Sequence, residues 1–181
     1  MIGFRKSKEF RLTWRQCAYL MLYMLVMVVV LVVLHEGAHI LAAMALGACF
    51  SELELGFIGI NPAVILPECF AGPCQTIVRY AGGLATGTIF LVFYLTYWVR
   101  KYQRNPGFFV WSLGAVTLMM AAMQYATGYL EGCYHAAYIA GAMEFFSPTE
   151  ILIYGWAAAA ILFHSALCPT RKMKEVSKAE T

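Results

Sequence analysis

Two histidines and a glutamate stand at the spacing of a zinc hydrolase site near the end of a long apolar run. They form the segment His35-Glu36-Gly37-Ala38-His39, an H-E-x-x-H pattern. Positions i and i+4 share one face of a helix, so both imidazoles can bind a single ion. Zn²⁺ suits two neutral imidazole nitrogens and a carboxylate oxygen, with a water in the fourth position. Glu36 is then placed to act as the general base toward that water.

A third metal ligand must come from elsewhere in the chain. The sequence has no aspartate, so the ligand must be Glu, His or Cys, and we expect Glu131. His135 follows four residues later and shares its face if the helix continues, either as an alternative ligand or as a donor to the developing oxyanion. The competing interpretation of Glu131 is an ordinary acidic residue at a membrane interface.

The composition requires a bilayer as solvent. Of the 181 residues, 61% are hydrophobic and 13% are charged, and the mean hydropathy is +0.67. A soluble domain of this size could not bury so much apolar surface. A basic patch with interleaved aromatics is lacking, so nucleic acid is not an expected partner. The competing interpretation of the motif is two packed histidines and a satisfied glutamate, but three ionisable groups within about one turn of a spanning helix are costly and indicate a function.

The elements that must position these residues are four apolar stretches, each long enough to cross the membrane. The sequence therefore predicts an all-α integral membrane protein with one membrane-embedded domain over residues 1–181. The spans are expected at about 14–47, 76–99, 107–131 and 151–167. A cleaved signal peptide is the alternative for the N-terminus, but its apolar run is too long. His164, in the last span, is expected to be a packed, hydrogen-bonded histidine.

The basic residues predict the orientation. Twelve of the thirteen Lys and Arg residues fall in three clusters that an even number of spans places on one side, so both termini should be cytoplasmic. The exception is Arg79, at the start of the second span. The clusters are Arg5, Lys6, Lys8, Arg11 and Arg15; Arg100, Lys101 and Arg104; and Arg171, Lys172, Lys174 and Lys178.

The same clusters predict the depth of the site. His35 lies 20 residues after Arg15, which is about 30 Å along a straight helix. Glu131 lies 27 residues after Arg104 on a helix that runs the same way. Both should therefore lie near the extracytoplasmic edge of the membrane.

Two segments face that side. Residues 51–58 nearly alternate polar and apolar types, which favours a short strand or hairpin that covers the site or pairs with an extended substrate. Ser147-Pro148 is typical of a cap before the fourth span. Cys69 and Cys74 could form a disulfide, with Cys49 or Cys133 as other partners, and free thiols are the alternative.

These residues resemble the site-2 protease family of intramembrane metalloproteases. The likeness rests on His35-Glu36-Gly37-Ala38-His39, on the small-residue stretch Ala81-Gly82-Gly83-Leu-Ala-Thr-Gly87, and on Leu130-Glu131-Gly132, which is similar to the family's Leu-Asp-Gly. It covers roughly residues 20–135. The resemblance implies His35, His39 and Glu131 as zinc ligands and Glu36 as general base. Gln124 is the candidate for the substrate-orienting amide, because it stands where the family has an Asn.

We therefore expect an intramembrane zinc metalloprotease that hydrolyses peptide bonds of membrane-associated proteins or peptides. Two alternatives use the same residues. One is a non-proteolytic membrane metal-binding protein, and the other is a scaffold derived from a protease. The sequence does not predict the oligomeric state or the identity of the substrate.

Overall fold

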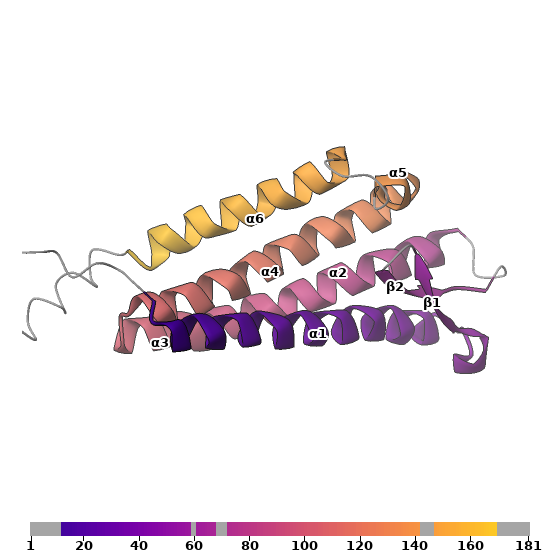
Figure 1. Cartoon of the computed structure of the whole chain (residues 1–181). Helices are drawn as coiled ribbons and strands as arrows, with labels where there is room; N and C mark the ends of the chain where they lie inside the picture. Colours follow the sequence, from indigo (N-terminus) through magenta and orange to yellow (C-terminus); the bar gives the residue numbers. More distant parts are fainter. Residues whose placement is uncertain (1–11, 59–60, 68–71, 142–146, 170–181) are drawn as a thin grey trace, which may run out of the picture.

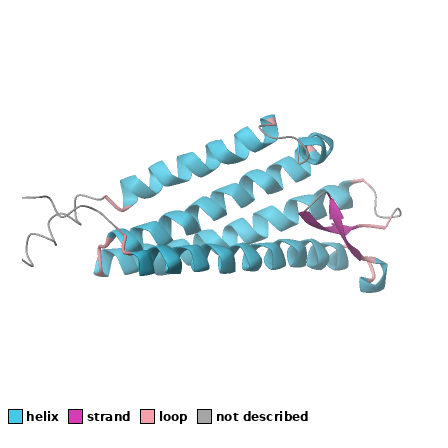
Figure 2. Ribbon diagram, in the orientation of Figure 1, coloured by secondary structure: helices cyan, strands magenta, loops and turns pink. Residues whose placement is uncertain are grey.

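The computed structural model describes residues 12–58, 61–67, 72–141 and 147–169. Its long helices lie along one another and a small hairpin sits at one end (Figures 1 and 2). Eight of the basic residues used to predict the orientation lie outside this part of the chain, as does Cys69. They are Arg5, Lys6, Lys8, Arg11, Arg171, Lys172, Lys174 and Lys178.

Within the described residues, four helical stretches are long and apolar enough to cross a membrane. They are α1 (Trp14–Ala45), the stretch Pro73–Arg104, α4 (Phe108–Cys133) and α6 (Pro148–Leu167). The second stretch consists of α2 (Pro73–Phe93), a π-helical turn η2 (Tyr94–Trp98) and α3 (Val99–Arg104). The prediction of a mainly helical chain with four such stretches is confirmed, and the second begins and ends several residues beyond its predicted bounds.

Local side-chain chemistry sets where the helices begin. The Thr13 hydroxyl accepts the Gln16 N–H at 3.3 Å, and Gln16 Oε1 accepts the Thr13 N–H at 2.8 Å, so α1 opens with a capping box. Ser147 caps α6 by accepting the Glu150 N–H, and Pro148 takes the first helical position, as predicted. At the far end of α1, Gly47 has φ 101°, a conformation that glycine adopts without strain.

The core of the bundle lies where α2 crosses α4. A Cβ on Gly83 would overlap the backbone of Gly128 and the Gln124 carbonyl oxygen, so both glycines allow the two backbones to approach closely. Because α4 is held tightly against α2, residues near the C-terminal end of α4 have a fixed position relative to α2.

A two-stranded antiparallel hairpin follows α1. The strands are β1 (Glu54–Ile58) and β2 (Asn61–Ile65), and Leu55 lies opposite Val64. The alternation of residues 51–58 predicted β1. In Figure 1 the hairpin lies at the end of the bundle where α1 ends and α2 begins. The short helix α5 (His135–Gly141), after α4, lies at the same end.

The opposite end of the bundle is where α1 begins and α3 ends (Figure 1). Arg15 lies in the first turn of α1, and Arg100, Lys101 and Arg104 lie in α3, so these four basic residues share that end. That this end is cytoplasmic remains a prediction from the charge pattern. His164 is buried nearer to it and is hydrogen-bonded to Tyr94 Oη at 2.8 Å and to the Trp111 carbonyl oxygen at 3.0 Å, as expected for a packed histidine.

Candidate metal centre

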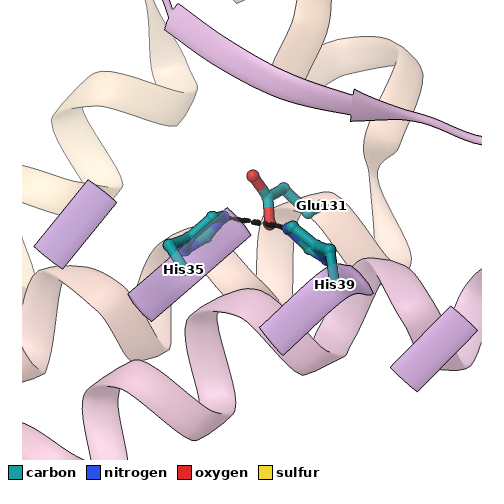
Figure 3. Close-up of side chains that lie close together, drawn as sticks. All are labelled: His35, His39 and Glu131. Carbon is teal, nitrogen blue, oxygen red and sulfur yellow. Dashed lines mark hydrogen bonds and ion pairs between the residues drawn. The ribbon is translucent and has the colours of Figure 1, made fainter. Parts of the chain in front are cut away.

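Three side chains from two helices converge near the hairpin end of the bundle. His35 and His39 come from α1, and Glu131 comes from the last turn of α4. The two Nε2 atoms are 3.0 Å apart, and Glu131 Oε2 lies 3.3 Å from His35 Nε2 and 3.7 Å from His39 Nε2 (Figure 3). The group can hold a metal ion.

The outer nitrogen of each imidazole has its own partner. His39 Nδ1 is 2.6 Å from the Val78 carbonyl oxygen, and because a carbonyl only accepts, Nδ1 must carry the hydrogen. His35 Nδ1 donates likewise to Gln124 Oε1 at 2.7 Å. In the neutral rings both Nε2 atoms are therefore unprotonated, and their lone pairs point into the centre.

The centre consequently gathers three electron-pair donors. Glu131 Oε2 is buried and accepts no hydrogen bond in the part of the chain that the structure describes. A proton on one ring would join only two of the three atoms, whereas a metal ion satisfies all three at once. Buried lone pairs that face one another without a cation are unfavourable, so the arrangement favours a bound cation.

The backbone of α2 encloses the metal centre together with the side chains from α1 and α4. A Cβ on Gly82 would overlap the His39 ring and lie 2.7 Å from His35 Nε2. Only a residue without a side chain leaves the two rings where they are. The same helix supplies the Val78 carbonyl oxygen to His39, so α2 sets both the position and the tautomer of this ring.

Glu36 lies beside the centre without joining it. Its Oε2 accepts the backbone N–H of Val64 on β2 at 3.0 Å. The hairpin therefore orients this carboxylate, and one of the two strands passes over the three converging side chains in Figure 3. A carboxylate held next to a metal centre, with one oxygen uncommitted to the hairpin, can accept a proton from a water in the space between them.

Comparison with known proteins adds no evidence to the geometry of the metal centre. Neither the family models, nor the curated proteins, nor the solved structures gave a match to the chain. The likeness to site-2 proteases therefore rests on the motifs alone.

A cavity of about 300 Å³ opens next to the centre. It lies between the hairpin, the first turns of α2 and the junction of α4 with α5. Glu36, His39 and Glu131 form the wall on the side of the metal centre. The other lining residues are Ala63, Val64, Ile65, Leu66, Gln75, Val78, Arg79, His135, Tyr138 and Ile139.

His135 lines the cavity but does not belong to the group of converging ligand atoms in the described residues. Helix α4 ends at Cys133 and α5 starts at His135, so the helix does not continue through this point as the i+4 argument required. Burial lowers the pKa of His135, and the charge of Arg79 lowers it further. The imidazole is therefore neutral around pH 7 and retains one N–H as a donor.

Tyr138 is a site residue that the sequence did not single out. It lines the cavity together with Glu131, and the negative charge of Glu131 acts on its phenol. Burial raises the pKa of Tyr138, and the negative charge of Glu131 raises it further, so the phenol stays protonated and acts as a donor. No pattern in the sequence marks it, because it depends on the turn between α4 and α5.

The other predicted residues take definite places. Gln124 binds His35 and is not among the residues that line the cavity, so its substrate-orienting role stays a prediction. Cys49, Cys74 and Cys133 form no disulfide with one another within the described ranges. Cys133 Sγ instead pairs with Tyr80 Oη. A bond between Cys74 and Cys69 is not tested, because Cys69 lies outside those ranges.

Proposed function

We propose that the chain is a membrane-embedded zinc metallopeptidase of the site-2 protease type that hydrolyses peptide bonds of membrane-associated substrates. The observation that carries the proposal is the convergence of His35, His39 and Glu131, with Glu36 on the wall of the adjoining cavity. Two histidines and a glutamate are a known ligand set of catalytic zinc sites.

The donor set fits zinc. Tetrahedral ligands at about 2.0–2.2 Å from Zn²⁺ lie about 3.3–3.6 Å from one another. The three separations of 3.0, 3.3 and 3.7 Å bracket that value. Imidazole and carboxylate ligands suit zinc, and the hydrogen bonds to Gln124 and Val78 are the outer contacts that fix ligand tautomers at metal sites.

The residues divide the chemistry among them. When bound, zinc polarises a carbonyl and lowers the pKa of a water. Glu36 takes the proton of the attacking water on a carboxylate oxygen and delivers it to the leaving amine nitrogen. The Val64 N–H holds the other oxygen, so the base keeps its orientation during the transfer.

His135 is the proposed donor to the carbonyl oxygen of the substrate as it gains negative charge. Its neutral imidazole lines the same cavity as Glu36 and Glu131. A hydrogen-bond donor placed where charge develops stabilises the transition state more than the ground state. Tyr138, a protonated phenol that lines the same cavity as Glu131, is the proposed hydrogen-bond donor to that carboxylate.

A bilayer around the bundle explains the outer surface. In the most apolar 18-residue stretch of α1, no residue is buried inside the molecule, and large side chains such as Met21, Leu25 and Val33 are exposed. Lipid is the solvent in which such a surface is stable. The substrate is then a peptide segment that reaches the site from within the membrane or from its edge.

Metal content tests the ligand set. Wild-type protein purified in detergent should hold one zinc per chain, and Glu131→Ala should lose it because only two ligands remain. His135→Ala should keep the zinc, since His135 lies outside the ligand cluster. Zinc loss in His135→Ala together with retention in Glu131→Ala would reverse the assignment of the third ligand.

Cleavage tests the reaction. Glu36→Gln should retain zinc and lose the cleavage of a membrane peptide by about 10²–10⁴-fold, the usual contribution of a general base. If wild type holds zinc and cleaves no membrane peptide, the chain is a metal-binding protein and not a protease. If elemental analysis finds no metal, the scaffold interpretation replaces both.

A further inference from the structure

The cavity beside the metal centre has one cationic wall. Arg79, on α2, is half-buried and lines the cavity, and Gln75 lies one helical turn before it and lines the same space. Among the described lining residues, Arg79 is the one Lys or Arg. Ile65, Leu66 and Ile139 form an apolar part of the remaining wall.

Arg79 on α2 and His135 on α5 both line the cavity. Burial is the larger cause of the lowered pKa of His135, and the positive charge of Arg79 lowers it further, so the two side chains lie within electrostatic range of each other. Arg79 also shows no ion pair with a carboxylate in the stretches that the structure covers.

Charge balance indicates what the guanidinium binds. A divalent ion in the proposed zinc site carries two positive charges, and Glu36 and Glu131 together carry two negative charges. These groups cancel, which leaves the positive charge of Arg79 unbalanced among the described residues that line the cavity. An unpaired cation in a partly buried site near hydrocarbon is costly, so the loaded site favours one added negative charge.

From this juxtaposition we infer that the cavity binds a peptide segment carrying a carboxylate, which Arg79 holds with the Gln75 amide beside it. The guanidinium presents a planar pair of N–H donors that matches a carboxylate in a bidentate arrangement. The carboxylate is either an acidic side chain near the scissile bond or the α-carboxylate of a chain end. This inference rests on the proposed function, because it names the substrate class of that site.

The size of the cavity agrees with a short segment. About 300 Å³ is at the lower end of the range for ligand pockets, so a few extended residues fit and an intact helix does not. Ile65, Leu66 and Ile139 then contact apolar side chains next to the acidic one. Arg79 is a specificity-determining residue in this arrangement, and it is not a ligand of the metal.

A binding measurement tests the inference without requiring cleavage. The probes are three short fluorescent alanine peptides with N-methylated amide bonds, which resist hydrolysis. One has a free C-terminal carboxylate, one has a C-terminal carboxamide, and one has a carboxamide end with an internal Glu. Zinc-loaded wild type should bind at least one carboxylate probe about tenfold or more tightly than the neutral probe, since a hydrogen bond to a charged group contributes about 1.5–3 kcal/mol. The stronger of the two carboxylate probes identifies the source of the negative charge.

Substitutions locate the effect. Arg79→Gln should abolish the preference for the carboxylate probes. Arg79→Lys should keep part of that preference, because lysine keeps the positive charge and lacks the planar pair of N–H donors. Arg100→Gln, in α3 at the other end of the bundle, is the matched control and should leave the preference intact. Zinc stoichiometry should stay at the wild-type level in all three variants. If Arg79→Gln does not fold, the graded response of Arg79→Lys against Arg100→Gln still decides the matter.

Removal of the metal provides an independent test of the inference. Without zinc, Glu36 and Glu131 outweigh Arg79, so chelated protein should lose the preference for the carboxylate probes. Equal binding of charged and neutral probes by loaded wild type, or a preference that survives Arg79→Gln, would overturn the inference. So would displacement of the carboxylate probes by phosphatidylglycerol bicelles and not by phosphatidylcholine bicelles, because the guanidinium would then serve lipid headgroups. Cleavage that does not depend on Arg79 would leave the proposed protease standing and remove only its substrate class.

Discussion

The backbone of Gly82 on α2 lies against the His39 imidazole on α1, so closely that a Cβ at this position would overlap the ring. The contact joins two helices at the point where the histidine lone pairs converge. It also explains why a stretch of small residues belongs opposite the H-E-x-x-H motif. The geometry of the metal centre depends on this glycine as well as on the ligands.

Gly82→Ala should therefore weaken zinc binding by about tenfold or more, because overpacking costs about 1–3 kcal/mol and the imidazoles must move to relieve it. Competition with a chelator of known affinity measures the change. Gly155→Ala on α6 is the matched control, since nothing lies within 4 Å of its added Cβ. Equal zinc affinity in Gly82→Ala and wild type would show that the rings do not need this space.

Gln124 positions a ligand through its outer nitrogen. Its Oε1 accepts from His35 Nδ1 at 2.7 Å, so Gln124→Leu should leave a buried donor without a partner and free the ring to turn. Substitution of such partners reduces metal affinity by about 10–100-fold. Gln124→Glu keeps an acceptor oxygen and should retain most of the affinity. Loss of cleavage in Gln124→Leu with unchanged zinc affinity would instead favour the substrate-orienting role.

The hairpin acts on the general base through a single backbone N–H. Val64→Pro deletes the donor to Glu36, while Val64→Ala trims the side chain and leaves the donor in place. Because this N–H bonds to Glu36 and not across the hairpin, the proline should leave the strand pairing largely intact. We expect Val64→Pro to lower kcat by about tenfold or more at unchanged zinc content, since a hydrogen bond to a charged group contributes about 1.5–3 kcal/mol. Similar kcat values for the two variants would argue against this role of the hairpin.

The pKa of His135 responds to Arg79. Burial is the larger cause of the lowered pKa, and the positive charge of Arg79 adds to it by disfavouring the imidazolium. Arg79→Gln should therefore raise the pKa of His135 while leaving it below the ordinary value of about 6.5, because burial remains. Histidine-selective NMR over pH 4–8 measures the change, with Arg100→Gln as the control. A pKa that stays constant or falls would mean that the guanidinium does not act on this imidazole.

The sequence by itself predicted the helices and most residues of the candidate site. The motif at residues 35–39 needs only helical periodicity to place two imidazoles on one face, and the apolar stretches need only their length to indicate four spans. Counting residues from the basic clusters to His35 and Glu131 placed both at one depth, because each helix rises by a fixed distance per residue. Alternation at residues 51–58 likewise predicted the strand β1.

The tertiary structure decided every contact that depends on how the helices are rotated and joined. The break at Tyr134 leaves His135 outside the ligand cluster, and the turn between α4 and α5 brings Tyr138 to the cavity that Glu131 lines. The Val78 carbonyl and the Val64 N–H are main-chain groups, which no side-chain pattern can reveal. Depth along a helix follows from residue counting, but azimuth and close approach follow from packing, and packing joins residues that are far apart in the chain.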